Sequence, residues 1–334
     1  MSNPTIVLAM MDGHVDTAFT EQHFARLDAV GRVLDARPLA RLDDERATAL
    51  LAQAEVLLGH WGCPTLTADV LARAPHLRLF AYAAGTVKWQ VTDALWDRDI
   101  VVTSAAAANA IPVAEYTVAM ILLANKGVLL IREFQRDPSL RLPIDRMRIG
   151  NVAKRVGIVG ASHVGRLVIE RLRPYDLAIA VYDPYLSTAD SESLGVERVA
   201  DLDELCATVD VLSIHAPDIE ATRGMVGAAQ LARLRDHAVV INTARPALVD
   251  QDALLRELRT GRISAILDVA DPDPLPVDHP LLALPNAFVT PHIAGSLGTE
   301  LHRMADHAVA EVERFARGEP PRHPVRRSDI DRIA

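Results

Sequence analysis

Short runs of apolar residues alternate along the first third of the chain with segments in which apolar residues recur every three or four positions. Continuous short runs are typical of strands buried on both faces, and the longer period is typical of amphipathic helices. The runs predict strands at residues 5–10, 56–60, 77–83 and 100–104, with one more near 32–36. The predicted helices between them are 21–30, 45–54, 66–74 and 91–98. This alternation predicts a parallel sheet with helices on both faces.

A second alternation of the same kind begins near residue 155. Its predicted strands are 155–159, 177–182, 211–215, 238–243, 263–268 and 287–290. Helices are predicted between them at 164–173, 201–208, 227–235 and 251–260. Six strands joined by crossover helices are the number in a complete dinucleotide-binding domain of the Rossmann type. The predicted fold class is therefore α/β, with two doubly wound parallel-sheet domains.

Two long helices are predicted outside both alternations, at about 112–127 and 296–317. Asn109 and Ser296 are their predicted N-caps. The second helix leads into a short polar tail, so we expect the C-terminus to pack on the first domain.

The predicted domains are 1–108 together with 297–334, and 109–296. Because the chain passes twice between them, we expect a cleft between the domains, with paired hinges. Residues 131–150 are rich in arginine and proline, and we expect an extended arm there rather than a core element.

The 334-residue chain carries 35 basic and 44 acidic residues and a formal net charge of −9. This balance argues against a general nucleic-acid or anionic-membrane binder, which presents a basic face. The longest apolar run, residues 116–124, is too short to cross a membrane. The spacing of Cys63 and Cys206 fits neither a disulfide framework nor a metal site. We therefore expect a reduced, cytoplasmic protein without a bound metal.

A glycine turn follows the first strand of the second alternation. Gly160, Ser162 and Gly165 occupy the positions of a G-x-G-x-x-G motif, with serine in the middle, and Asp183 ends the next strand 18 residues after Gly165. Such a turn admits a pyrophosphate to the N–H groups of a helix N-terminus, and the acid receives ribose hydroxyls. The pattern predicts a dinucleotide site; the alternative is a turn that needs glycine for steric reasons alone.

Polar side chains follow three later strands of this domain, where open α/β sheets place their sites. These residues are Arg245, the acids Asp268 and Asp273, and His292. Together they suit reduction of a 2-keto acid. An arginine can bind the substrate carboxylate in a bidentate fork, a histidine can supply the proton, and a carboxylate can orient the imidazolium. The alternative for each residue is a turn cap, a helix start or a surface ion pair.

The chain resembles the D-isomer-specific 2-hydroxyacid dehydrogenase family over nearly its whole length. Besides the glycine turn and Asp183, the matching segments are Ser213–Pro217 with Thr222, Asn242–Asp250, Leu267–Val269 with Asp273–Pro276, Pro291–Ala294, and Ala84–Val87 in the first domain. The order and spacing of these segments are more specific than any one of them. The resemblance implies a flavodoxin-like substrate domain and a Rossmann NAD-binding domain.

The resemblance also implies a role for individual residues. Arg245 and His292 would be catalytic, with Asp273 as the partner of the histidine. Further cofactor contacts are implied for Gly160, Ser162, His163, Val164, Gly165, Asp183, His215, Ala216, Pro217, Thr222, Thr243, Ala244, Asp268 and His292. Substrate contacts are implied for Trp61, Gly85, Thr86, Val87 and Arg245. His215 has the alternative of a purely structural role, and Trp61 that of a core residue.

Four departures from the family pattern bear on activity. Ser162 replaces a glycine, and Asp273 stands where the family usually has glutamate, so either the backbone must approach the histidine or a water must bridge. Pro246 replaces a glycine and biases Arg245 toward an extended backbone. The segment 87–90 replaces the usual Gly-x-Asp-Asn of the substrate loop.

The sequence favours NAD over NADP, because Asp183 would repel a 2′-phosphate and the following Pro184 and Tyr185 offer no cation. Gly59-His60-Trp61-Gly62 stands where phosphoglycerate-type relatives carry arginine. We therefore expect an unphosphorylated substrate, such as glyoxylate, hydroxypyruvate or a bulkier apolar keto acid. The family resemblance implies a homodimer formed through the nucleotide domain.

These observations predict an NAD-dependent 2-hydroxyacid dehydrogenase that acts as a 2-keto acid reductase. One alternative is a catalytically weak NAD-sensing or co-regulator protein on the same fold, which the departures would fit. Another is a related oxidation, of formate or phosphonate, on the same scaffold.

Overall fold

The computed structural model describes residues 3–137, 139 and 149–330, and the chain divides into two compact units. Residues up to Asn109 and from Ser296 onward form unit 1, and residues Ala110–Gly295 form unit 2. Each unit contains one sheet with helices on both faces, so the predicted α/β fold class is confirmed.

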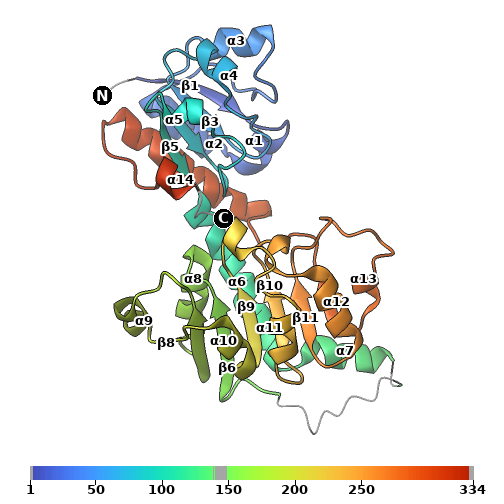
Figure 1. Cartoon of the computed structure of the whole chain (residues 1–334). Helices are drawn as coiled ribbons and strands as arrows, with labels where there is room; N and C mark the ends of the chain where they lie inside the picture. Colours follow the sequence, from blue (N-terminus) through green and yellow to red (C-terminus); the bar gives the residue numbers. More distant parts are fainter. Residues whose placement is uncertain (1–2, 138, 140–148, 331–334) are drawn as a thin grey trace. The chain divides into compact units, whose positions relative to one another are not determined.

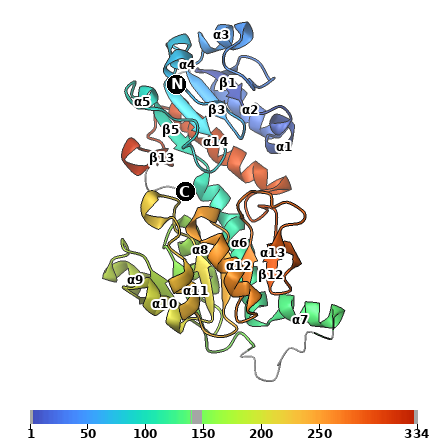
Figure 2. The same cartoon turned by 45° about the vertical axis from the view of Figure 1, so that its right-hand side comes forward.

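Unit 1 is built on a six-stranded sheet in the order β13-β5-β4-β3-β1-β2. Its strands are β1 (Thr5–Ala9), β2 (Arg32–Val33), β3 (Val56–Gly59), β4 (Leu79–Tyr82), β5 (Val101–Ser104) and β13 (Pro324–Val325). The first five are mutually parallel, as predicted. The short β13, which the sequence pattern did not predict, runs antiparallel to β5 at the edge (Figure 2).

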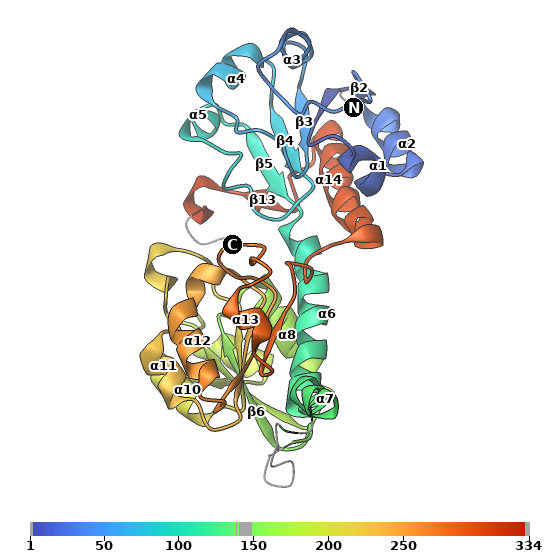
Figure 3. The same cartoon turned by 90° about the vertical axis from the view of Figure 1, so that its right-hand side faces the viewer.

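The helices of unit 1 bury one apolar core on each face of its sheet. One core includes side chains from α3 (Glu45–Leu51), α4 (Ala68–Arg73) and α5 (Asp93–Trp96). The other includes side chains from α1 (His14–Ala18), α2 (Glu21–Val30) and α14 (Leu301–Ala316) (Figure 3). The C-terminal helix, red in Figure 1, therefore packs on the N-terminal strands, as the sequence led us to expect.

Unit 2 is built on a seven-stranded parallel sheet in the order β12-β11-β10-β9-β6-β7-β8. Its strands are β6 (Lys154–Val159), β7 (Leu177–Tyr182), β8 (Glu197–Arg198), β9 (Val211–Ile214), β10 (Val239–Asn242), β11 (Ser264–Leu267) and β12 (Ala287–Val289). The six longer strands lie within the predicted ranges or begin one residue before them. The chain leaves β6 toward β7 and returns to β9 on its other side, so the topological switch point lies between β6 and β9.

Helices cover both faces of the unit 2 sheet (Figure 3). One face carries α10 (Leu202–Thr208), α11 (Ala228–Arg233) and α12 (Gln251–Arg259). The other carries α6 (Ala106–Asn125) and α8 (His163–Leu172). Three further helices belong to this unit: α7 (Val128–Arg136), α9 (Thr188–Leu194) and α13 (Pro280–Ala283).

Helix α6 begins six residues before the predicted start, at Ala106, so Asn109 lies within it and is not its N-cap. The alanine-rich segment 105–110 extends the helix before Pro112, because alanine is the strongest helix former. By length and composition α6 is the one helix in the described residues that could cross a membrane. Its Ala114 and Ile121 are buried against the unit 2 sheet, so α6 is a core helix.

Two other local predictions are wrong. Ser296 does not cap the last helix, because a 3₁₀ turn at Gly298–Glu300 precedes α14 and the Ser296 amide donates to Asn109 Oδ1 (2.9 Å). The predicted arm is not extended at its start, since residues 131–136 belong to α7, but none of these residues is buried, as expected of a segment outside the core. Residues 138 and 140–148 of that arm lie outside the described residues.

Candidate active site

The site in unit 2 is set by a row of six strand residues in mutual register. Tyr182, Val159, Ile214, Asn242, Leu267 and Val289 pair across the sheet, each with its neighbour. The residues that directly follow them are Asp183, Gly160, His215, Thr243, Asp268 and Thr290. Because all six strands are parallel, these residues emerge at one edge of the sheet, beside the switch point. Five of them are predicted site residues, and Thr290 is one that sequence reasoning missed.

The glycine turn requires glycine at two positions. Gly160 has φ +93°, and a Cβ there would lie 2.8 Å from the Ala216 nitrogen. A Cβ on Gly165 would lie 2.1 Å from the Gly160 oxygen, so α8 packs against the turn as closely as backbone permits. A bulkier residue at either position would close the space between β6, β9 and the start of α8. These features fit a turn shaped for close approach of a phosphate.

Ser162 fits the middle position of the motif because its φ is −68°. It is the N-cap of α8, and its hydroxyl accepts a hydrogen bond from the Gly165 N–H (3.4 Å). The N–H groups of His163 and Val164 have no acceptor among the described residues. A ten-residue helix with free N-terminal N–H groups at a glycine cradle fits a dinucleotide pyrophosphate.

Asp183 is tied to the glycine turn by its own side chain. Its carboxylate accepts from the Ala161 N–H (2.7 Å) and from the Tyr185 N–H (2.8 Å). A cation that sequence reasoning missed lies on the first turn of α8, where Arg166 Nε donates to the Ala161 oxygen (3.0 Å). The guanidinium of Arg166 is also 4.0 Å from Asp190.

His215 is buried behind the turn and has a structural partner. Its Nε2 lies 2.9 Å from Ser213 Oγ, and burial lowers its pKa to about 3, so the ring is neutral at physiological pH. The backbone of its neighbour Ala216 lies against Gly160 and leaves no room there for a Cβ. The Thr222 hydroxyl donates to the Pro217 oxygen (2.6 Å) and holds the loop that follows. These residues shape the crevice rather than present polar groups to it.

The loop after β10 is held by Asn242, a residue to which the sequence assigned no role. Its side chain accepts from the Ala244 N–H (3.0 Å) and donates to the Arg245 oxygen (2.9 Å). Thr243 makes a buried hydroxyl contact with Thr117 of α6 (2.9 Å). Arg245 is extended, with φ −143° and ψ 145°, as the following proline predicts.

The Arg245 guanidinium is half-buried, and it forms no ion pair within the described part of the chain. One N–H donates to the Ala244 oxygen (2.7 Å). Burial lowers the pKa of this guanidinium, because its charged form loses water, while Asp218 acts in the opposite direction. A guanidinium remains protonated in proteins, so this is a desolvated cation with donors to spare, as a carboxylate ligand requires.

Asp268 is a buried carboxylate that organises the turn after β12. It accepts hydrogen bonds from Thr290 Oγ1 (2.6 Å) and from the N–H groups of Ile293 and Ala294 (both 2.8 Å). Asp268 is 1% exposed, so these three donors take the place of water around its carboxylate. The observed contacts give it a structural role in this turn.

His292 and Asp273 form a direct pair. His292 Nδ1 lies 2.7 Å from Asp273 Oδ2, so no bridging water is needed despite the shorter side chain. The histidine has φ +56°, a left-handed conformation that is uncommon outside glycine. Because a carboxylate only accepts, Nδ1 carries the proton of this bond, and Nε2 is left for another partner.

The predicted substrate residues of unit 1 also follow strand ends. Trp61 is partly exposed just beyond β3, and Gly85, Thr86 and Val87 follow β4. The Val87 side chain is buried in the core, so only its backbone can face a ligand. The N–H groups of Gly85, Thr86 and Val87 donate to no other group that the structure describes.

A doubly wound sheet with a glycine cradle at its switch point defines a dinucleotide-binding domain. The family model for the NAD-binding domain of D-isomer specific 2-hydroxyacid dehydrogenases matches residues 118–294, just over half of the chain. The chain belongs to this family of NAD-dependent oxidoreductases.

Individual relatives agree with this assignment. The chain is 33% identical over 310 residues to the D-3-phosphoglycerate dehydrogenase of Methanocaldococcus jannaschii, covering 91% of this chain and 57% of that protein. It is 33% identical to the glyoxylate reductase of Korarchaeum cryptofilum, covering 77% and 78%. The crystal structure of a phosphoglycerate oxidoreductase from Rhizobium etli superposes with a TM-score of 0.80 at 26% identity, covering 97% and 98%.

The chain spans only about half the length of the curated phosphoglycerate dehydrogenases that it matches.

The buried state of His215 predicts acid sensitivity. Its folded pKa of about 3 lies below the ordinary value of 6.5, so unfolding takes up a proton between these values. The neutral His215 therefore contributes to the free energy of unfolding in full above pH 6.5. As the pH falls below 6.5, this contribution decreases by about 1.4 kcal/mol per pH unit. We expect His215→Gln to flatten the fall in unfolding free energy between pH 7 and 5, measured with urea. The exposed His76→Gln is the control; equal slopes for both variants would contradict the assignment.

Proposed function

We propose that the protein is an NAD-dependent D-2-hydroxyacid dehydrogenase that reduces 2-keto acids. The observation that carries the proposal is the 2.7 Å pair of His292 Nδ1 with Asp273, beside a sheet edge shaped for a dinucleotide. The glycine cradle, the free N–H groups of α8 and the carboxylate of Asp183 would hold the cofactor. When bound, the reduced nicotinamide supplies a hydride to the keto carbon.

The residues of the chain would supply the other parts of the reaction. Arg245 would bind the substrate carboxylate in a bidentate fork through its unused N–H donors. His292 would give the proton on Nε2 to the carbonyl oxygen as that oxygen gains charge. Asp273 would hold the imidazolium through Nδ1 and so direct Nε2 toward the substrate.

We expect an unphosphorylated substrate. His60 is fully buried, and burial together with His14 lowers its pKa to about 3, so it offers no positive charge to a phosphate. Its neighbour Trp61 presents an aromatic ring in contact with the His14 and His60 rings. Glyoxylate, hydroxypyruvate or a bulkier apolar keto acid suits such surroundings better than a phosphorylated acid.

We also place the protein in the cytoplasm, since both of its cysteines, Cys63 and Cys206, are buried free thiols.

A panel of keto acids tests the activity. We expect NADH oxidation with an unphosphorylated 2-keto acid, and His292→Ala to lower kcat by about 10²- to 10⁴-fold, the usual contribution of a general acid. Asp273→Asn should lower kcat about tenfold or more, because a neutral amide does not stabilise the imidazolium. Asp273→Glu should retain activity, and the exposed His76→Ala is the control.

Two results of this panel would contradict the proposal. Tight NADH binding without turnover of any keto acid would favour an NAD-sensing protein. An unchanged kcat in His292→Ala would exclude His292 as the proton donor.

The carboxylate of Asp183 is expected to select NADH over NADPH, because a 2′-phosphate would meet its negative charge. The nearby Arg166 does not offset this charge in our proposal, since it pairs with Asp190. We expect Asp183→Asn to reduce the ratio of kcat/KM for NADH to that for NADPH by about tenfold, a loss of one charge repulsion. Asp278→Asn, at an exposed acid elsewhere in unit 2, is the control. A wild-type preference for NADPH would refute the assignment.

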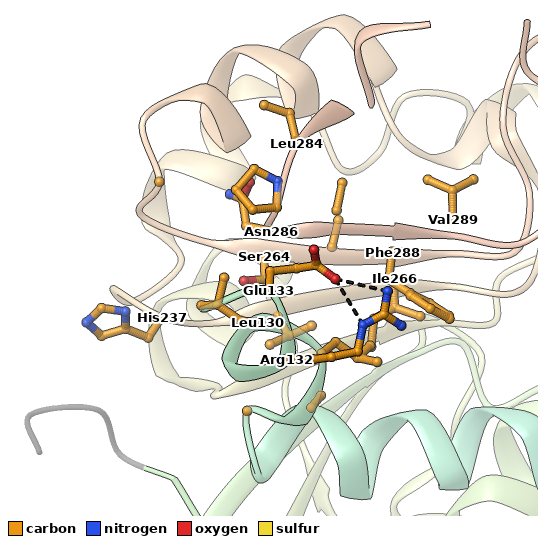
Figure 4. Close-up of a pocket in the computed structure, with 18 of the residues that line it drawn as sticks. Leu130, Arg132, Glu133, His237, Ser264, Ile266, Leu284, Asn286, Phe288 and Val289 are labelled. Carbon is orange, nitrogen blue, oxygen red and sulfur yellow. Dashed lines mark hydrogen bonds and ion pairs between the residues drawn. The ribbon is translucent and has the colours of Figure 1, made fainter. Parts of the chain in front are cut away.

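We further propose that unit 2 forms a homodimer through α7. No residue of this strongly amphipathic helix is buried, and Leu130 faces a cavity of about 540 Å³ (Figure 4). The cavity is also lined by Ile266, Phe288 and Leu284, and by the first residues of β6, β10 and β11. An apolar helix face beside an open cavity supports association with a second copy.

The dimer is tested by light scattering coupled to size-exclusion chromatography. We expect a dimeric wild type and a monomeric Leu130→Glu, because a charge at an apolar contact is costly to bury. Val277→Glu, at a fully exposed valine elsewhere in unit 2, should remain dimeric. A monomeric wild type would end this proposal without touching the catalytic one.

A further inference from the structure

We propose that Tyr116 is a positioning residue for the reaction, acting on His292 through a relay of hydroxyl groups. The inference rests on the proposed function. Tyr116 lies on α6, and its hydroxyl is 2.7 Å from Thr290 Oγ1. Thr290 Oγ1 is in turn 2.6 Å from Asp268 Oδ1. Tyr116 is thus joined to the turn that carries His292, although it lies 174 residues from Thr290 in the chain.

The direction of each hydrogen bond in the relay is determined. The Asp268 carboxylate also receives the N–H groups of Ile293 and Ala294, so it acts as an acceptor. Thr290 has one hydroxyl proton, and that proton is used on Asp268. The Thr290 oxygen must therefore accept from Tyr116. Burial, with a contribution from Asp268, raises the pKa of Tyr116, so the phenol stays protonated and remains a donor.

The relay bears on His292 through the backbone of its turn. The backbone carbonyl oxygen of Asp268 accepts a hydrogen bond from the His292 N–H (2.9 Å). The carboxylate of the same residue accepts from the next two N–H groups, those of Ile293 and Ala294. His292 has φ +56°, and a non-glycine residue keeps that conformation only where its surroundings over-determine it. A donor to Thr290 strengthens the Thr290–Asp268 bond, because hydrogen bonds in a chain polarise one another. Tyr116 thereby helps to hold the imidazole toward Asp273.

The neighbouring residue of α6 makes a comparable contact at a second strand end. Thr117 Oγ1 is 2.9 Å from Thr243 Oγ1, two residues before Arg245. Adjacent residues of one core helix are therefore bonded to the loops that carry the proposed acid and the proposed carboxylate ligand. Helix α6 thus contacts both the turn that carries His292 and the loop that carries Arg245.

Steady-state kinetics with matched variants test the relay. Tyr116→Phe keeps the ring and removes the donor, and we expect kcat for keto acid reduction to fall about fivefold, with KM for the keto acid within twofold. Thr290→Val should lower kcat by at least the same factor. Thr290→Ser keeps a hydroxyl group and should have a kcat close to that of the wild type. Because both residues act in one chain, the double variant should be no slower than Thr290→Val alone. Tyr175→Phe, at an exposed tyrosine of unit 2, is the control.

Hydrogen exchange of the protein without ligands supplies a readout that does not require activity. We expect Tyr116→Phe to raise amide exchange several-fold in a peptide covering residues 290–294, and Tyr175→Phe to leave it unchanged. Losses of kcat that add in the double variant, or unchanged exchange in Tyr116→Phe, would overturn the inference. If the wild type reduces no keto acid, the proposed function fails, and the exchange experiment alone then decides whether Tyr116 holds the turn.

Discussion

The parallel register of the unit 2 sheet is the constraint on which the candidate site depends. Six strands end on one paired row, so the residues after Val159, Ile214, Asn242 and Leu267 emerge side by side. A slip of one residue in any strand would exchange the side chains that pack in the two cores and would move its final polar residue out of the row. The hydrophobic effect that fixes this register therefore also assembles the site.

Buried polar side chains then shape the irregular loops beyond that row. Asp268 holds the turn around His292, and Asn242 holds the backbone on both sides of Arg245. Leaving a buried donor or acceptor without a partner costs about 1–3 kcal/mol, so each of these side chains strongly favours one loop conformation. His292 and Asp273 are both exposed, whereas Asp268, which holds the turn that carries His292, is buried.

Much of this arrangement can be predicted from the sequence, because buried parallel strands are continuous apolar runs and polar residues mark their ends. The six longer strands of unit 2 and five of the six residues that directly follow them are predicted in this way. Local signals failed where tertiary contacts decide. Asn109 resembles a cap, yet its amide oxygen binds the Ser296 backbone, and β13 is only two residues long. Nothing near Tyr116 in the sequence indicates Thr290, since that contact exists only once the sheet has formed.

The departures from the family pattern are accommodated by the backbone around them. Ser162 occupies a negative φ and caps α8, so the missing glycine removes no conformational freedom that the turn uses. Asp273 is shorter than the usual glutamate, yet it meets His292 at 2.7 Å, which requires the two backbone segments to lie closer together. The hydrogen bond between His292 and Asp273 therefore forms directly, and neither of these two departures removes a contact on which the turn depends.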